Sequence, residues 1–203
     1  MNVWSRKVLP LLIAWAMRDR DLVRYRKRLV ERAQGRVLEI GVGSGLNLPL
    51  YRPPASLVIG LDPSAELLRR ARAEAAASPV PVCLVQGSAE AIPLAAGSVD
   101  TVVMAWTLCS VPDAAKALAE LRRVLRPEGR LLFVEHGLSD EPGVAGWQQR
   151  LDPFWLKVSC HMNLKVGELL QRAGFVVEEL ETGYVGKGPR ALTFLYEGSA
   201  RPA

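Results

Sequence analysis

A glycine-rich segment near residue 40 has the residue types that suit binding of a nucleotide-like ligand. Gly41, Gly43 and Gly45 follow Glu39 in the pattern E-x-G-x-G-x-G. Glycine lets the backbone turn sharply and approach a ligand with no Cβ atom in the way. The dinucleotide pattern G-x-G-x-x-G needs a glycine where this chain has Leu46, so the close approach of a pyrophosphate is disfavoured.

A single acid ends the next apolar run of the chain. Asp62 lies 21 residues after Gly41, where a carboxylate can accept hydrogen bonds from both hydroxyls of a ribose. Such an acid suits any adenosine-containing cofactor, so by itself it leaves both NAD and S-adenosylmethionine open. Glu39 favours the second, because a carboxylate beside the loop repels a pyrophosphate and attracts a cofactor that carries an ammonium and a sulfonium.

The second half of the chain carries residues that could move a proton. His136 and His161 are its two histidines, and imidazole is the natural proton acceptor near neutral pH. Asp152 could orient one of them, and Trp147 and Trp155 could wall an apolar pocket or face a sulfonium. Each residue also has a structural interpretation, since histidines satisfy backbone groups, aspartates end turns and tryptophans fill cores.

The elements that must position these residues alternate along the chain. The predicted strands are 36–40, 56–62, 81–86, 99–106, 130–135, 175–180 and 191–196, and the predicted helices end near 77, 125 and 173. Continuous apolar strands separated by helices predict a parallel sheet that is covered on both faces. Ligands bind beyond the carboxyl ends of such strands, where the strand order reverses, and the glycine loop and Asp62 would meet there.

Five ordered segments within residues 36–136 resemble those of class I S-adenosylmethionine-dependent methyltransferases. They are 37–46, 61–63, 87–94, 97–100 and 121–129. The resemblance implies an α/β fold with a Rossmann-like, doubly wound, seven-stranded sheet, mostly parallel with the last strand antiparallel, and S-adenosyl-L-methionine as cofactor. The implied cofactor-binding residues are Glu39, Gly41, Gly43, Gly45, Asp62, Pro63, Ser88, Ala89 and Thr107. Relatives often carry an acid in place of Ser88, and a hydroxyl is a weaker acceptor than a carboxylate.

Later motifs resemble the microsomal alkyl-thiol methyltransferases and their bacterial relatives. These motifs are 107–111, 135–136, 147–155 and 160–164. The resemblance implies a small lipophilic methyl acceptor, with a thiol as the leading candidate, while neighbouring branches methylate quinone carbons and phospholipid amines. We therefore predict that His136, His161 and Asp152 are catalytic. The predicted substrate-binding residues are Trp147, Trp155, Cys160 and Asn163.

The N-terminus is strongly basic, whereas the body of the chain is nearly neutral. Residues 1–36 carry ten Lys/Arg and three Asp/Glu, which accounts for the whole net charge of +5. We predict a basic amphipathic helical arm over 1–34 and a methyltransferase domain over 35–203. The arm is interpreted as a helix packed over the domain or as an interfacial helix on a membrane surface. The apolar run 8–17 is too short to cross a bilayer, and a secretory signal is disfavoured.

Composition excludes several classes of protein. At 49% hydrophobic and 23% charged residues, the chain is neither disordered nor a disulfide scaffold. Three cysteines without a CxxC pair favour a reducing compartment and a cytoplasmic location. Hydrolase, NTPase and zinc motifs are missing, and the basic arm lacks the interleaved aromatic residues that would favour nucleic acid. A nicotinamide-dependent oxidoreductase and a non-catalytic cofactor-binding protein stay open as alternatives from other classes.

Overall fold

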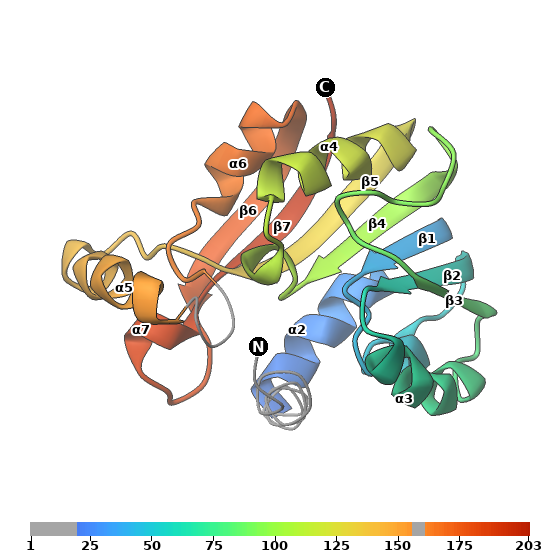
Figure 1. Cartoon of the computed structure of the whole chain (residues 1–203), viewed down its shortest axis with the longest axis horizontal. Helices are drawn as coiled ribbons and strands as arrows, with labels where there is room; N and C mark the ends of the chain where they lie inside the picture. Colours follow the sequence, from blue (N-terminus) through green and yellow to red (C-terminus); the bar gives the residue numbers. More distant parts are fainter. Residues whose placement is uncertain (1–19, 156–160) are drawn as a thin grey trace.

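A seven-stranded sheet with helices on both faces forms the molecule, as the computed structural model shows for residues 20–155 and 161–203 (Figure 1). The elements are α2 (Arg20–Glu31), β1 (Gly35–Ile40), η2 (Leu48–Leu50), β2 (Ala55–Asp62), α3 (Ala65–Ala76), β3 (Val82–Gln86), β4 (Val99–Ala105), η3 (Leu108–Ser110), α4 (Ala114–Val124), β5 (Leu125–His136), α5 (Pro142–Trp155), α6 (Val166–Arg172), β6 (Phe175–Tyr184), α7 (Arg190–Thr193) and β7 (Phe194–Pro202).

The strand order is β3-β2-β1-β4-β5-β7-β6. The strands from β1 to β5 pair in parallel, and β7 lies antiparallel to both β5 and β6. The order reverses at β1, which pairs with β2 on one side and β4 on the other. Loops that follow β1, β2 and β4 therefore meet at the edge where open α/β sheets bind ligands. The predicted Rossmann-like sheet with an antiparallel last strand is confirmed.

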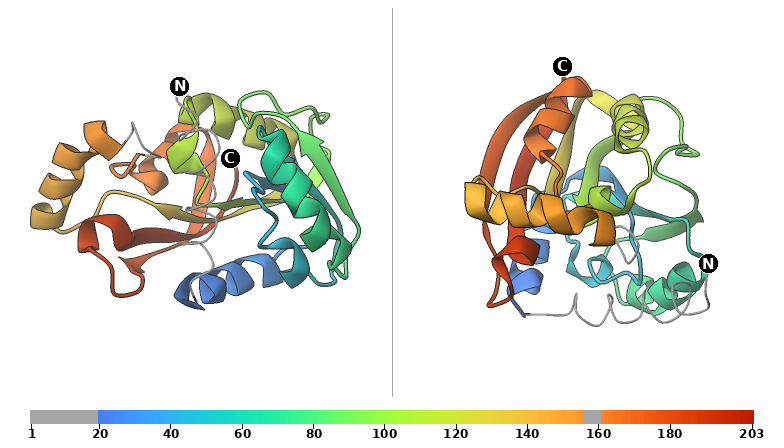
Figure 2. Two further views of the ribbon diagram at one scale, coloured as in Figure 1. Left: turned by 60° about the horizontal axis from the view of Figure 1, so that its bottom comes forward. Right: turned by 60° about the vertical axis from the view of Figure 1, so that its left-hand side comes forward.

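Side chains on the two faces of the sheet form two separate hydrophobic clusters. Leu38 and Ile40 of β1 belong to the cluster that α4 and α6 cover, whereas Val37 belongs to the cluster that α2 and α3 cover. Figure 2 shows these helices on opposite sides of the sheet. Because successive side chains of a strand point to opposite faces, a strand covered on both faces has to be apolar throughout. This explains the continuous apolar runs in the sequence.

Three strands differ from their predicted bounds by more than one residue. β7 begins at Phe194 and reaches Pro202, whereas the sequence predicts 191–196, because residues 191–193 form part of α7. A Cβ atom at Gly198 would lie 2.0 Å from the carbonyl oxygen of Glu179 in β6, so β7 needs glycine at this position. This glycine makes the sequence of β7 less apolar. The chain also pairs with β4 from Leu125 onward rather than from 130, and β6 runs to Tyr184 through mostly polar residues.

α2 packs over the sheet, as the first interpretation of the basic arm expects. Leu29 and Val30 are buried in the cluster that α2 and α3 share, while Arg24 and Lys27 face solvent. Val23, one member of the predicted repeat, is 40% exposed and lies outside that buried face. The apolar run 8–17 lies outside the described residues, and the boundary at 34 and 35 stays a prediction. None of the described helices combines the length and the apolar character that a bilayer crossing requires.

Candidate functional site

The glycine loop after β1 has a backbone that only glycine adopts easily. Gly41, Gly43 and Gly45 have φ of +62°, +56° and +84°. A Cβ atom on Gly41 would lie 2.3 Å from Oγ1 of Thr107, so the turns after β1 and β4 are packed directly together. A Cβ atom on Gly43 would meet nothing closer than a carbonyl oxygen at 3.8 Å. The loop is therefore tightly packed at its first glycine and open at its second, where a ligand could approach.

Asp62 joins the loops that follow β1 and β2. Its Oδ2 accepts a hydrogen bond from the amide of Gly43 at 2.9 Å, and its Oδ1 accepts one from the amide of Ser64 at 2.8 Å. Burial raises the pKa of Asp62, which is 6% exposed, while the two backbone hydrogen bonds lower it. Each carboxylate oxygen keeps acceptor capacity beyond these bonds, which is what a ribose diol requires. The next residue, Pro63, is exposed.

Glu39 lies below the loop in a buried polar network. It is 2% exposed; its Oε1 accepts from the Asn47 side-chain amide at 2.9 Å and its Oε2 accepts from the Tyr51 hydroxyl at 2.8 Å. The guanidinium of Arg26 donates to Oδ1 of the same asparagine at 2.8 Å. Burial raises the pKa of Glu39 to about 7, although these three residues lower it. Both carboxylate oxygens of Glu39 therefore accept hydrogen bonds from other residues of the chain. The predicted role of Glu39 in cofactor binding stays a prediction.

The turn after β4 holds a strained residue. Trp106 has a φ of 50°, which is unusual for any residue other than glycine. Its indole lies under the guanidinium of Arg26, at 4.8 Å, and its buried Nε1 has no hydrogen-bond partner within the described residues. The sequence predicts position 106 only as the end of a strand and Arg26 only as one charge of a basic helix. Neither residue has a spacing pattern that could have indicated this contact.

A buried carboxylate from β5 holds the same turn in place. Oε1 of Glu135 accepts hydrogen bonds from the amides of Thr107 at 2.8 Å and Leu108 at 3.0 Å. The Thr107 hydroxyl donates to the carbonyl oxygen of Ile40, the last residue of β1, at 3.1 Å. These contacts fix η3 against the glycine loop. The threonine is itself buried, and its predicted contact with the cofactor stays a prediction.

The segment after β3 contains the predicted adenine-binding residues. Ser88 donates to Oε2 of Glu90 at 3.0 Å, and Oε1 of the same glutamate accepts from the amide of Asp113 at 2.9 Å. Ala89 between them is buried. Relatives often carry an acid at the position of Ser88. In this chain the acid, Glu90, lies two residues later and accepts from the serine hydroxyl. Only the structure shows that this acid contacts the serine.

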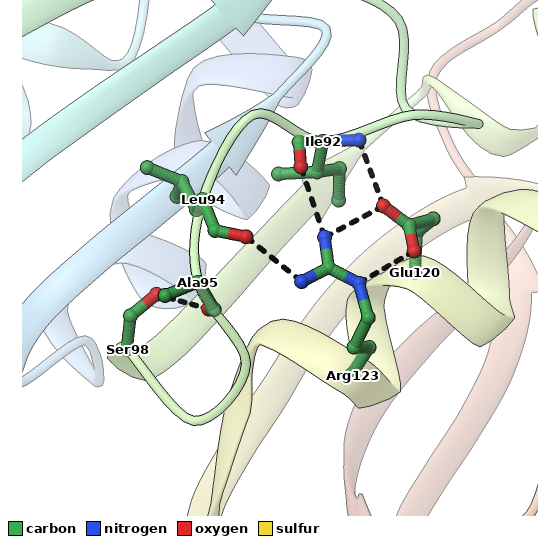
Figure 3. Close-up of polar contacts among 6 residues, drawn as sticks. All are labelled: Ile92, Leu94, Ala95, Ser98, Glu120 and Arg123. Carbon is green, nitrogen blue, oxygen red and sulfur yellow. Dashed lines mark hydrogen bonds and ion pairs between the residues drawn. The ribbon is translucent and has the colours of Figure 1, made fainter.

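Two residues of α4 hold the same segment against the domain (Figure 3). Arg123 donates to the carbonyl oxygens of Leu94 at 2.8 Å and Ile92 at 2.9 Å. Glu120 accepts from the amide of Ile92 at 2.9 Å and pairs with Arg123 at 2.6 Å. The family-like segment 121–129 thus includes an arginine that positions the loop after β3.

His161 and Asp152 form a pair next to η3. Nδ1 of His161 lies 3.3 Å from Oδ2 of Asp152, whose Oδ1 accepts from the amide of Met162 at 2.7 Å. The backbone amide of His161 donates to the carbonyl oxygen of Cys109, which is buried in η3, at 2.7 Å. The aspartate is buried and can hold the imidazole with a proton on Nδ1, which leaves Nε2 as the basic nitrogen. The structure therefore brings two of the three predicted catalytic residues together.

His136 has a different environment at the end of β5. Burial lowers its pKa to about 4, although a hydrogen bond with the backbone of Phe194 raises it. An imidazole with so low a pKa is neutral at pH 7 and is a weak base. The two histidines are therefore not equivalent, which the sequence alone does not indicate.

The predicted substrate-binding residues that the structure describes differ in their exposure to solvent. Trp147 on α5 is 60% exposed and has the guanidinium of Arg150 at 5.9 Å from its ring centre. The core interpretation is therefore wrong for Trp147, because its helix turns this side chain toward solvent. Trp155 and Asn163 are partly buried, and Cys160 lies outside the described residues. Their contacts with a substrate stay predictions.

The packing of the first loop glycine predicts a large effect of one methyl group. We expect Gly41→Ala to lower the free energy of unfolding by about 3 kcal/mol, from about 1–2 kcal/mol of left-handed backbone and about 1–3 kcal/mol of overpacking against Thr107. Gly97→Ala is the matched control, since Gly97 has a φ of +59° and open space around it. Urea unfolding of both variants would measure the difference. Equal losses would show that the packing against Thr107 is unimportant.

The sequence of this chain is similar to those of known methyltransferases. Residues 38–133 match a family model described as a methyltransferase domain. The chain is 36% identical over 157 residues to the human thiol S-methyltransferase TMT1B, an alignment that covers 73% of this chain and 64% of that protein. It spans 59–64% of the length of the thiol S-methyltransferases that it matches.

Two further relatives act on other acceptors according to their names. The phosphatidylethanolamine N-methyltransferase of Cereibacter sphaeroides is 35% identical over 65% of this chain and 66% of its own length. The demethylmenaquinone methyltransferase of Thermus thermophilus is 38% identical over 56% of this chain and 54% of its own length. Among solved structures, a SAM-dependent methyltransferase of Methanosarcina mazei aligns with a TM-score of 0.69 and 21% identity, over 83% of this chain and 92% of that one.

Proposed function

Since this chain belongs to the class I S-adenosylmethionine-dependent methyltransferases, we propose that it transfers a methyl group to a thiol on a small lipophilic molecule. The thiol S-methyltransferases among its relatives support this acceptor. The observation that carries the proposal is the pair of His161 and Asp152 next to η3, which supplies an oriented base on the acceptor side of the glycine loop.

The residues present fit S-adenosylmethionine. Gly43 leaves the loop open to a ligand, and Asp62 offers a carboxylate to the ribose from the adjoining loop. Glu39 adds negative charge that suits a cofactor with an ammonium and a sulfonium. When bound, S-adenosylmethionine supplies an electrophilic methyl carbon, whose bond to the sulfonium sulfur breaks as the acceptor sulfur bonds to that carbon.

The protein's own part in this reaction is to position and deprotonate the acceptor. Holding two reactants in line can remove about 7–11 kcal/mol of the barrier, so no covalent intermediate is required. A free thiol has a pKa of about 8.5, and Nε2 of His161 takes its proton while Asp152 holds Nδ1. Burial lowers the pKa of His136 to about 4, which makes its imidazole a weak base, so we assign the proton transfer to His161.

An acceptor screen with S-adenosylmethionine labelled in its methyl group tests the proposal. The panel pairs a long-chain alkyl thiol with the alcohol of the same chain length, and adds a hydroxylated quinone and an ethanolamine lipid in vesicles. We expect label on the thiol and none on the alcohol, because only the thiol ionises near neutral pH.

The other acceptors separate the alternatives. Label on the quinone or the lipid alone would replace the thiol as the substrate class, in keeping with the quinone and phospholipid methyltransferases among the relatives. A chain that binds no S-adenosylmethionine in calorimetry would overturn the methyltransferase proposal itself.

We further propose that the enzyme acts in the cytoplasm and does not bind nucleic acid, and that the basic arm within residues 1–34 contacts membrane surfaces.

A further inference from the structure

We propose that Arg26 is a positioning residue for the cofactor: it fixes Asn47 and Trp106 and places a positive charge near Glu39. The proposal rests on the proposed function, because its ligand is S-adenosylmethionine. It concerns α2, which precedes the segment 38–133 that the family model matches.

Arg26 is buried, unlike the other basic residues of α2 whose side chains the structure describes. It is 6% exposed, whereas Arg24, Lys27 and Arg28 are exposed. A charged side chain is rarely buried unless other groups compensate the loss of hydration. The burial of Arg26 therefore indicates a specific structural role for its guanidinium.

The first contact of Arg26 leads to the cofactor loop. Its guanidinium donates to Oδ1 of Asn47, whose side-chain amide donates to Oε1 of Glu39. Because the asparagine uses its acceptor toward the arginine and its donor toward the glutamate, its orientation is fixed by both neighbours. Tyr51 donates to the other oxygen of Glu39. The network therefore links α2 to the carboxyl end of β1.

The second contact of Arg26 leads to the acceptor side. Its guanidinium lies 4.8 Å over the ring of Trp106, the residue with the left-handed backbone between β4 and η3. The same turn continues into η3, where the carbonyl oxygen of Cys109 accepts from the amide of His161. The side chain of Arg26 therefore contacts two parts of the site. One is the turn before η3, the short helix to which His161 is hydrogen-bonded, and the other is the network that holds Glu39.

The charge of Arg26 has a measurable consequence at Glu39. Within the described residues, the charged and titratable groups that face Glu39 are Arg26 from α2 and Tyr51 after η2. Burial and the nearby carboxylate raise the pKa of the tyrosine well above its ordinary value, so it stays a neutral donor. Burial raises the pKa of Glu39 to about 7, and the guanidinium opposes this rise. Without that charge, the glutamate would stay protonated to a higher pH.

Calorimetric titration of S-adenosylmethionine into the full chain between about pH 6 and about pH 9 tests the proposal. The wild-type affinity should rise with pH around a midpoint of about 7, as Glu39 ionises. Arg26→Gln should move this midpoint upward by about one pH unit, because a nearby opposite charge shifts a pKa by about that much. Arg26→Lys should keep the wild-type midpoint because it keeps the charge. Arg24→Gln is the control of identical chemistry on the exposed face and should match the wild type.

Coinciding profiles of Arg26→Gln and the wild type would overturn the proposal. If thermal unfolding shows that Arg26→Gln does not fold, Asn47→Ala takes its place, because Asn47 is the hydrogen-bonded link between Arg26 and Glu39. This variant should also move the midpoint upward, since the hydrogen bond from Asn47 lowers the pKa of Glu39. A wild-type profile for that variant would overturn the proposal equally. A wild-type chain that binds no S-adenosylmethionine at any pH would instead contradict the proposed function, so the two failures are distinguishable.

Discussion

Replacing Asp62 by alanine should weaken the binding of S-adenosylmethionine by at least about 100-fold, since hydrogen bonds to a charged group contribute about 1.5–3 kcal/mol each. The variant loses the carboxylate that would accept from the ribose. It also leaves the amides of Gly43 and Ser64 without the acceptor that now holds them at 2.9 Å and 2.8 Å. The loop after β1 would lose its fixed geometry as well as its ligand contact. Isothermal titration calorimetry at neutral pH measures this loss.

Asp62→Asn is the informative control for that experiment. An asparagine keeps the shape, but its carbonyl oxygen can accept from only one of the two backbone amides, and its NH₂ group faces the other. We expect an affinity between those of the wild type and the alanine variant. Thermal unfolding without ligand separates loss of the contact from loss of the fold. An alanine variant that binds within about threefold of the wild type, a difference below about 1 kcal/mol, would show that Asp62 does not contact the ribose.

Removal of the imidazole of His161 should slow methylation of an alkyl thiol by about 100-fold or more at neutral pH, the usual contribution of a positioned base. The matched variant His136→Ala should retain most of the rate, because a group with a pKa of about 4 is a poor proton acceptor. Single-turnover rates with saturating cofactor compare the two histidines without interference from product release.

The acidity of the acceptor makes this comparison sharper. A thiol that is already ionised at the assay pH needs no base, so the defect of His161→Ala should shrink when an aryl thiol of lower pKa replaces the alkyl thiol. An equal defect with both thiols would indicate that His161 positions the acceptor and does not deprotonate it. Near-wild-type rates with both thiols would remove it from the mechanism.

The sequence predicts the cofactor side of the site better than the acceptor side. The glycine loop and Asp62 lie at the ends of adjacent strands, so a local pattern together with parallel pairing is enough to bring them together. The pair of His161 and Asp152 depends on the packing of His161 against η3, which no local pattern specifies. The sequence therefore indicates that Asp152 could orient a histidine, but not which one.

Residues that act through tertiary contacts could not be found from their spacing. Arg26 belongs to a run of basic residues, and only the packing of α2 distinguishes it from Arg24. Tyr51 follows Glu39 by twelve residues in an irregular segment, so its hydrogen bond to Oε2 has no periodic signal. For Trp147 the core interpretation is wrong, because the orientation of α5 leaves this side chain in solvent, whereas its predicted contact with a substrate stays a prediction.

The position of α2 limits how far the protein can be shortened. This helix lies before the matched segment 38–133, yet its Leu29 and Val30 share a hydrophobic cluster with Val134 and Leu195 on the sheet. A gene fragment that starts at β1 would leave that apolar surface uncovered and prone to aggregation. The smallest useful expression product therefore has to include α2 from Arg20 onward, even though family boundaries alone would suggest a later start.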